Sequence, residues 1–114
     1  MSKDLFLKII SREIPADVVY ETAEILGFRD INPQAPVHIV VIPKERIETT
    51  DDLTEKHQKI AGKLLLAATE IARQEKISET GYRLVMNCRE HGGQTVFHIH
   101  MHLLGGRQLR WPPG

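Results

Sequence analysis

The most restrictive feature of the sequence is a set of three histidines in strict alternation near its end. They alternate with apolar residues inside residues 96–104, in the order His98, Ile99, His100, Met101, His102 and Leu103. Alternate side chains of a β-strand point to opposite faces of a sheet, so the pattern predicts a strand with imidazoles on one face and core side chains on the other. Partly buried imidazoles need hydrogen-bond partners and disfavour each other's protonation. We therefore expect this strand to do more than pack.

Length and composition predict one domain over residues 1–114, because 114 residues with 41% hydrophobic content suffice for a single core. The 15 basic and 15 acidic residues cancel, so no overall charge attracts nucleic acid or a membrane surface. The first residues are too polar for a signal peptide, and no window approaches the roughly 20 apolar residues of a membrane span, so we expect a cytoplasmic protein. The lone cysteine, Cys88, allows no internal disulfide.

Hydrophobic periodicity predicts an α+β domain, with a five-stranded, mainly antiparallel sheet, one long helix and one short helix. Residues 5–10 repeat apolar side chains at helical spacing and form the short helix. The long helix is expected to start at Asp51 and Asp52, where Asp52 and Glu55 form a capping-box pattern, and to end near Glu75. The expected strands are residues 18–21, 25–29, 37–42, 82–87 and 96–104, and Gly92 and Gly93 form the turn before the last one.

Three interpretations of the histidine strand remain open at this point: a metal site, a nucleophilic histidine in a phosphate pocket, and a structural stripe. A rise of about 3.3 Å per residue separates His98 and His102 by roughly 13 Å, which argues against one zinc ion bound by all three histidines. A site of two histidines helped by His38 or Asp30 remains open. The structural stripe would require a hydrogen-bond partner for each imidazole.

The residues before the histidines favour the phosphate pocket. Gly92 and Gly93 allow the backbone to approach an anion closely with its N–H groups. Gln94 and Thr95 add side-chain donors, and Asn87 adds an amide from the preceding strand. The sequence has no Gly-x-x-x-x-Gly-Lys-Ser/Thr phosphate loop and no Gly-x-Ser-x-Gly nucleophile elbow, so it gives no support to either of those hydrolase classes.

The central histidine, His100, is the natural nucleophile of such a pocket. An unperturbed histidine is largely neutral at pH 7, and a neutral imidazole can attack phosphorus. His98 and His102 would flank it and donate to phosphate oxygens. The product would be a phosphoryl- or nucleotidyl-histidine that water then hydrolyses, and Thr95 could pass a proton to the leaving group.

The pattern His-apolar-His-apolar-His-apolar-apolar at residues 98–104 resembles the motif of the histidine triad (HIT) superfamily. Within that superfamily the chain resembles the Hint branch, the histidine triad nucleotide-binding proteins, over nearly its whole length. The matching segments are residues 30–36, His38, residues 92–95 and the tail 105–114, which ends in Trp-Pro-Pro-Gly.

The resemblance implies a purine nucleoside phosphoramidase that hydrolyses the P–N bond of adenosine or guanosine 5′-phosphoramidates, with no metal or cofactor. It implies His100 as the nucleophile and His38 as a fourth pocket histidine. Asp30 would bind the ribose hydroxyls. The implied base walls are Phe6, Phe28 and Ile31, and the implied phosphate ligands are Asn87, Gly93, Gln94, Thr95 and His102. A non-catalytic module that binds purine nucleoside monophosphates with the same pocket is the alternative.

The resemblance also implies a homodimer whose two sheets join into one of ten strands. Trp111, the only tryptophan, lies in a proline-rich tail that cannot form a core of its own. We expect it to be buried against the partner, near the partner's substrate site.

Overall fold

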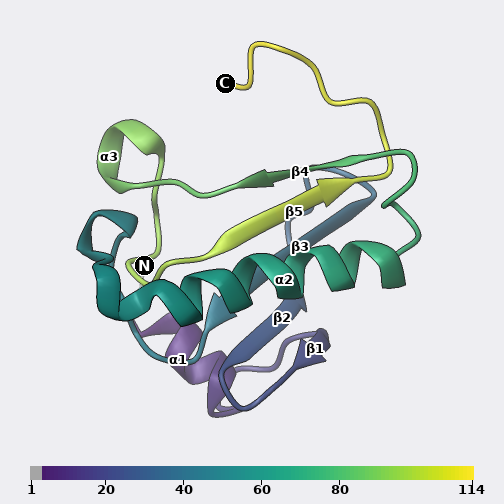
Figure 1. Cartoon of the computed structure of the whole chain (residues 1–114). Coiled ribbons are helices and arrows are strands. Elements are labelled where there is room, and N and C mark those ends of the chain that lie inside the picture. Colours follow the sequence, from purple (N-terminus) through teal and green to yellow (C-terminus); the bar gives the residue numbers. More distant parts are fainter. Residues whose placement is uncertain (1–3) are drawn as a thin grey trace.

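A computed structural model describes residues 4–114 of the chain, and a five-stranded sheet forms its centre (Figure 1). The strand order is β1-β2-β3-β5-β4, and every neighbouring pair is antiparallel. The strands are β1 (Val18–Glu21), β2 (Ile25–Arg29), β3 (Val37–Pro43), β4 (Tyr82–Val85) and β5 (Met101–Gly105). The predicted α+β class and antiparallel sheet are confirmed.

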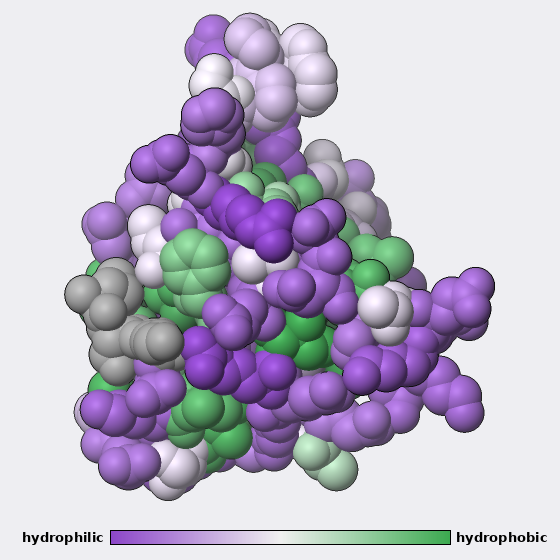
Figure 2. All heavy atoms as spheres, turned by 90° about the vertical axis from the view of Figure 1, so that its left-hand side faces the viewer, coloured by the Kyte–Doolittle hydropathy of each residue, from purple (hydrophilic) through white to green (hydrophobic). Residues whose placement is uncertain are grey.

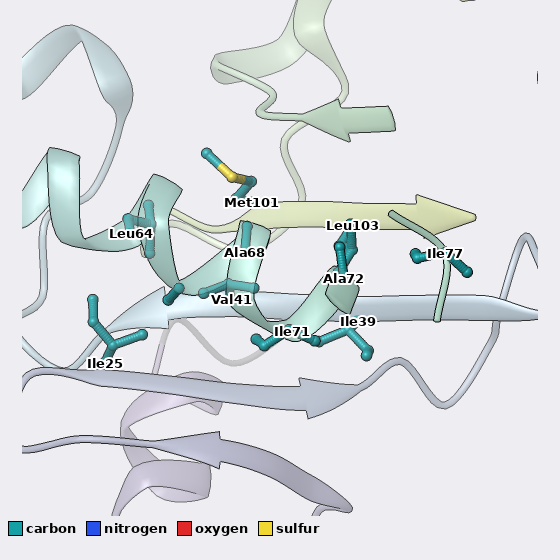
Figure 3. Packing of buried hydrophobic residues seen from close by; sticks show 11 residues of the cluster. Ile25, Ile39, Val41, Leu64, Ala68, Ile71, Ala72, Ile77, Met101 and Leu103 are labelled. Carbon is teal, nitrogen blue, oxygen red and sulfur yellow. The ribbon is translucent and has the colours of Figure 1, made fainter. Parts of the chain in front are cut away.

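The long helix α2 (Gln58–Gln74) covers one face of the sheet. Figure 3 shows its side chains, among them Ala68 and Ile71, packed against Val41 of β3 and Leu103 of β5. Fully burying one aliphatic side chain of this kind stabilises a fold by about 1.5–3 kcal/mol. A Cβ atom at Gly27 would lie 2.9 Å from Cδ1 of Ile71, so glycine in β2 allows this close packing.

The short helix α1 (Leu5–Ile10) packs on the opposite face of the sheet, as Figure 1 shows. Its buried residues Phe6 and Ile9 contact Leu26 and Phe28 of β2 and Val40 of β3. Since residues that face each other across an antiparallel pair share a side of the sheet, the pairing of Val40 with His102 places His102 on this face. The face away from α2 therefore carries the histidines of β3 and β5.

The predicted strand 96–104 is correct only from Met101 onward, because residues 96–100 do not join the ladder. This segment instead bonds to the part of the chain that follows β3: the backbone N of Ile99 donates to the carbonyl O of Ile47 over 2.7 Å. The alternation is still present, since Ile99, Met101 and Leu103 are all buried. Strand β4 also stops at Val85 rather than at residue 87.

The prediction that the long helix starts at Asp51 and Asp52 was wrong, since α2 starts at Gln58. Two short 3-10 turns precede it, η1 (Thr50–Asp52) and η2 (Glu55–His57), and each has a capping box of its own. The Asp52 carboxylate caps η1 from within by accepting hydrogen bonds from Thr49, so it does not start α2. His57 is buried and its Nδ1 accepts a hydrogen bond from the backbone N of Thr54.

The connection between β4 and β5 contains a further short helix, α3 (Arg89–Gly92). Gly93 ends it with a φ of 83°, a left-handed conformation that glycine adopts without strain. The expected turn at Gly92 and Gly93 is therefore a helix end. Among the described residues no helix is long and apolar enough to cross a membrane.

Candidate active site

Four histidines gather on the face of the sheet that carries α1. His38 lies in β3, His102 in β5, and His98 and His100 in the irregular segment before β5. The ring centroids of His100 and His102 are 5.0 Å apart, and those of His38 and His102 are 5.1 Å apart. Phe6 of α1 contacts His100 edge-on, with a centroid separation of 5.0 Å. The fold therefore brings His38, more than 50 residues away in sequence, to the predicted triad.

The His98 side chain is buried and bonds to the backbone, so it is not a ligand for an anion. Its ring is 0% exposed, and its Nε2 lies 2.7 Å from the carbonyl O of Pro43. A carbonyl can only accept, so Nε2 carries the proton and donates it to Pro43. Burial, with a smaller contribution from the charge of Arg46, lowers the pKa of His98. The ring cannot reach a phosphate, which contradicts the expectation that His98 donates to one, and its Nδ1 has no partner among residues 4–114.

The backbone of His98 instead sets the state of His100. The carbonyl O of His98 lies 2.8 Å from Nδ1 of His100, so Nδ1 carries the proton and Nε2 keeps a lone pair. Burial lowers the pKa of His100 and keeps its ring neutral at pH 7. A neutral imidazole with a free Nε2 lone pair is the form that can attack phosphorus.

His38 and His102 form a hydrogen-bonded pair whose direction is fixed by a backbone amide. The N–H of Gln34 donates to Nδ1 of His38 over 3.0 Å, so the proton of this neutral ring lies on Nε2. Nε2 of His38 then donates to Nδ1 of His102 over 2.9 Å, and His102 keeps its own proton on Nε2. Burial, together with the neighbouring imidazoles, lowers the pKa of His102 to about 4. His102 is therefore a neutral hydrogen-bond donor.

Of the residues predicted to bind ribose and base, Asp30 lies at this pair. The Asp30 carboxylate follows β2 and is half-buried, with Oδ2 3.4 Å from Nε2 of His38 and Oδ1 accepting from the backbone N of Asn32. Phe6 and Phe28 are buried and contact each other edge-on, with ring centroids 5.7 Å apart, so both serve the core. Ile31, which follows Asp30 in the chain, is an apolar residue that is 98% exposed among the described residues.

The predicted phosphate loop contains one residue whose side chain is already fully engaged. Gln94 is buried, its Nε2 donates to the carbonyl O atoms of Glu48 and Val96, and its Oε1 accepts from the backbone N of Arg89. Both N–H donors of the amide are therefore used inside the protein, and Gln94 holds the loop in place.

Thr95, by contrast, is exposed, and its hydroxyl has no hydrogen bond to any described residue. Asn87 is half-buried and lies against Gly92, where a Cβ atom would be 3.6 Å from the Asn87 backbone. Gly93 is exposed at the end of α3. The backbone N–H groups of Gly93 and Gln94 already donate to the carbonyl O atoms of Glu90 and Arg89, which contradicts the expectation that the Gly93 backbone binds a phosphate. The donors of this loop that remain available are the Thr95 hydroxyl and the Asn87 amide.

Trp111 lies in the tail that extends above β4 in Figure 1 and stands clear of the body in Figure 2. It is 81% exposed, and the carbonyl O of the preceding residue, Arg110, accepts a hydrogen bond from Arg83 of β4. Residues 4–114 of one chain therefore leave most of this tryptophan uncovered.

A metal ion is one possible occupant of the pocket, since Asp30, His38 and His102 each offer a ligand atom within 4.8 Å of the others. Zinc accepts such nitrogen and oxygen ligands. The protonation of His38 opposes it, however, because Nε2 would have to lose its proton while Nδ1 already faces the N–H of Gln34. The hydrogen bonding therefore fits a histidine pair better than a metal site.

Several groups that shape this site could not be found from side-chain patterns. The carbonyl groups of Pro43 and His98 and the amide of Gln34 set the histidine protons, and all three are backbone groups. Arg46 was also missed; its guanidinium donates to the carbonyl O of Phe97 over 3.2 and 3.3 Å and holds the segment before His98. A lone arginine after a strand gives no sequence signal for this contact.

Known proteins resemble the chain over almost all of its length. The sequence family described as the HIT domain matches residues 11–109. The purine nucleoside phosphoramidase of Escherichia coli is 54% identical over 92% of this chain and 88% of that protein. The adenylylsulfatase HINT1 of Arabidopsis thaliana is 51% identical over 99% of this chain and 78% of that protein. The crystal structure of a HIT family hydrolase from Legionella pneumophila has a TM-score of 0.95 at 53% identity, covering 96% of this chain and 98% of that one.

Proposed function

The chain belongs to the HIT domain family and to its Hint branch, as its sequence predicted, and on this basis we propose that it is a hydrolase of purine nucleotides. Its reaction is the cleavage of the P–N bond in purine nucleoside 5′-phosphoramidates. The observation that carries the proposal is the arrangement of protons on adjacent rings: His100 keeps a lone pair on Nε2, and His102, 5.0 Å away between ring centroids, keeps a proton on Nε2. One ring can attack phosphorus while the other donates to its oxygens.

The first step forms a bond between Nε2 of His100 and phosphorus, and it breaks the P–N bond. The amine leaves with a proton from solvent, which the exposed hydroxyl of Thr95 can relay. The product is nucleotidyl-His100, whose ring carries a positive charge while Nδ1–H donates to the His98 carbonyl. The carbonyl dipole stabilises that charge, and the N–H of His102 stabilises the charge on the phosphate oxygens. Water then attacks phosphorus, the bond from phosphorus to Nε2 of His100 breaks, and one proton of the water passes to solvent, which releases the nucleoside monophosphate and neutral His100.

Substrate binding divides among three groups of residues. The Asp30 carboxylate accepts hydrogen bonds from the ribose hydroxyls. Ile31 lies over the base, and this contact would bury a side chain that is now 98% exposed. Phe6 and Phe28 support the wall from the core, while Asn87 and Thr95 bind the phosphate, and Gln94 keeps that loop in place.

We also propose a homodimer that joins two sheets at β4. This strand pairs with β5 on one side, and its other edge has no partner strand among residues 4–114. An unpaired edge is a natural place for a second copy to add a strand. A surface cavity lies beside this edge, lined by Tyr82, Arg83, Arg107 and Leu109 among others, and could receive the partner's tail with Trp111.

Hydrolysis of adenosine 5′-phosphoramidate in the presence of EDTA tests the enzyme proposal. We expect turnover in EDTA, a mass increase of one adenylyl group when the reaction is quenched early, and loss of both in His100→Ala. His91→Ala, which replaces an exposed histidine of α3, is the matched control and should keep the activity. Equal activity in His100→Ala would refute the proposal. Binding of AMP by calorimetry without turnover of any amine leaving group would favour the non-catalytic module instead.

A further inference from the structure

The C-terminal tail begins with a contact between an arginine and the loop of residues 30–36. The guanidinium of Arg107 donates through Nε and Nη2 to the carbonyl O of Gln34, over 3.2 and 2.9 Å. Gly106, with a φ of 89°, brings the tail close to the same loop, where a Cβ atom would lie 2.9 Å from Cβ of Pro36. Two donors from one planar group fix the acceptor in direction as well as in distance. Arg107 therefore sets the position of Gln34.

Gln34 is also the residue whose N–H reaches Nδ1 of His38. A continuous chain of hydrogen bonds thus runs from the tail to the pocket, through Arg107, Gln34, His38 and His102. We propose that Arg107 is a positioning residue of the active site: by holding Gln34 it keeps the proton of His102 on Nε2, where it can serve a bound phosphate. The catalytic consequence rests on the proposed function, whereas the proton position does not.

The direction of this chain of hydrogen bonds depends on the Gln34 amide. If its N–H moved away, the proton of His38 could lie on Nδ1, and Nε2 of His38 would then accept a hydrogen bond from Nδ1–H of His102. Nε2 of His102 would present a lone pair to the phosphate, which repels its oxygens. Asp30 favours the same proton position on His38, since its Oδ2 lies 3.4 Å from Nε2. A ribose would engage that carboxylate, so in the substrate complex the Gln34 amide becomes the group that keeps the proton of His38 on Nε2.

The other contacts of the loop do not replace Arg107. The Asn32 backbone N donates to Asp30, and the Gln34 side chain donates to the carbonyl O of Asn32, so both bonds stay within the loop. Gln34 has hydrogen bonds to Asn32 in the loop, to His38 in β3 and to Arg107. Among the described residues, Arg107 is therefore its hydrogen-bond partner from outside the loop and β3. Arg107 itself is exposed, so its replacement removes little packing.

The proton positions can be measured directly in the free protein. Long-range proton–nitrogen NMR spectra of ¹⁵N-labelled protein distinguish Nδ1–H from Nε2–H for each histidine ring. We expect His102 to carry its proton on Nε2 in the wild type, and to show a mixture of both forms in Arg107→Ala. Arg110→Ala is the matched control, because it removes the same charge from the same tail and should leave the spectrum of His102 unchanged. Thermal unfolding of each variant establishes that it is folded.

Kinetics on adenosine 5′-phosphoramidate provide the second measurement. We expect kcat of Arg107→Ala to fall by roughly tenfold or less, the scale of one hydrogen bond, with a smaller change in KM. Arg107→Lys keeps the charge but loses the contact through two N–H groups, so its kcat should lie between those of the wild type and Arg107→Ala. A single Nε2–H form of His102 in folded Arg107→Ala overturns the proposal. Because this spectrum needs no substrate, it tests the positioning role even if the protein proves to have no phosphoramidase activity.

Discussion

Acid should destabilise the fold through His102, because its pKa falls from the ordinary 6.5 to about 4 in the folded protein. Burial is the main cause, and His100 and His38 add to it. Between these two values the unfolded chain binds a proton at this position and the folded chain does not, so falling pH favours unfolding. The stabilisation from His102 is complete above the unfolded value of 6.5. The shift corresponds to about 2 kcal/mol of stability lost between about pH 7.5 and about pH 5.

Urea unfolding at these two pH values, at constant protein concentration, measures the effect. His102→Gln keeps a polar side chain but cannot titrate, so it should lose about 2 kcal/mol less than the wild type on acidification. Titrating groups that do not interact with His102 are shared, and their contribution cancels in the comparison. His91→Gln, at an exposed position of α3, should lose as much stability as the wild type. Equal losses in the wild type and His102→Gln would show that burial does not hold His102 neutral.

Three further substitutions test separate parts of the structure. Ile31→Ala should weaken AMP binding in calorimetry by about 1 kcal/mol with no change in melting temperature, because Ile31 is 98% exposed in the free protein; a lower melting temperature would contradict this. Gly105→Ala would place a Cβ atom 2.6 Å from Cδ1 of Ile77 and should cost about 1–3 kcal/mol in urea unfolding, and Ile77→Val, which removes that atom, should recover part of the loss. Arg46→Ala removes both bonds to the Phe97 carbonyl and should lower kcat more than KM, and unchanged kinetics would exclude a role in holding the histidine segment.

The sheet was predictable because its signals are local. Alternation of period two places Ile99, Met101 and Leu103 on the buried side, and it does so even where the first of them lies outside the ladder. The apolar residues 37–42 likewise predicted a strand, and β3 lies at the centre of the sheet, with β2 and β5 on either side. A pattern of this kind depends on which face is buried and needs no knowledge of the partner.

The candidate site was less predictable because its contacts join backbone groups far apart in sequence. Spacing placed His98 beside His100 as a second donor, but the fold directs its ring into the core, to the carbonyl of Pro43. Likewise Gln94 has the chemistry of a phosphate ligand, yet its amide binds the carbonyl of Glu48. Side-chain type indicates what a residue can donate or accept. It does not indicate which distant carbonyl will occupy it.

The four histidines have different roles because the backbone assigns their protons differently. Two carbonyl groups, of Pro43 and His98, fix a proton on the nitrogen that faces them, whereas one amide, of Gln34, fixes a lone pair. The first arrangement leaves His100 with a free lone pair, and the second, passed through His38, leaves its neighbour His102 with a free N–H. Nucleophilic attack on an anionic phosphate needs both states side by side, and burial keeps both rings uncharged. It follows that a change in the loops that supply these backbone groups should abolish the proposed reaction while all four histidines remain in place.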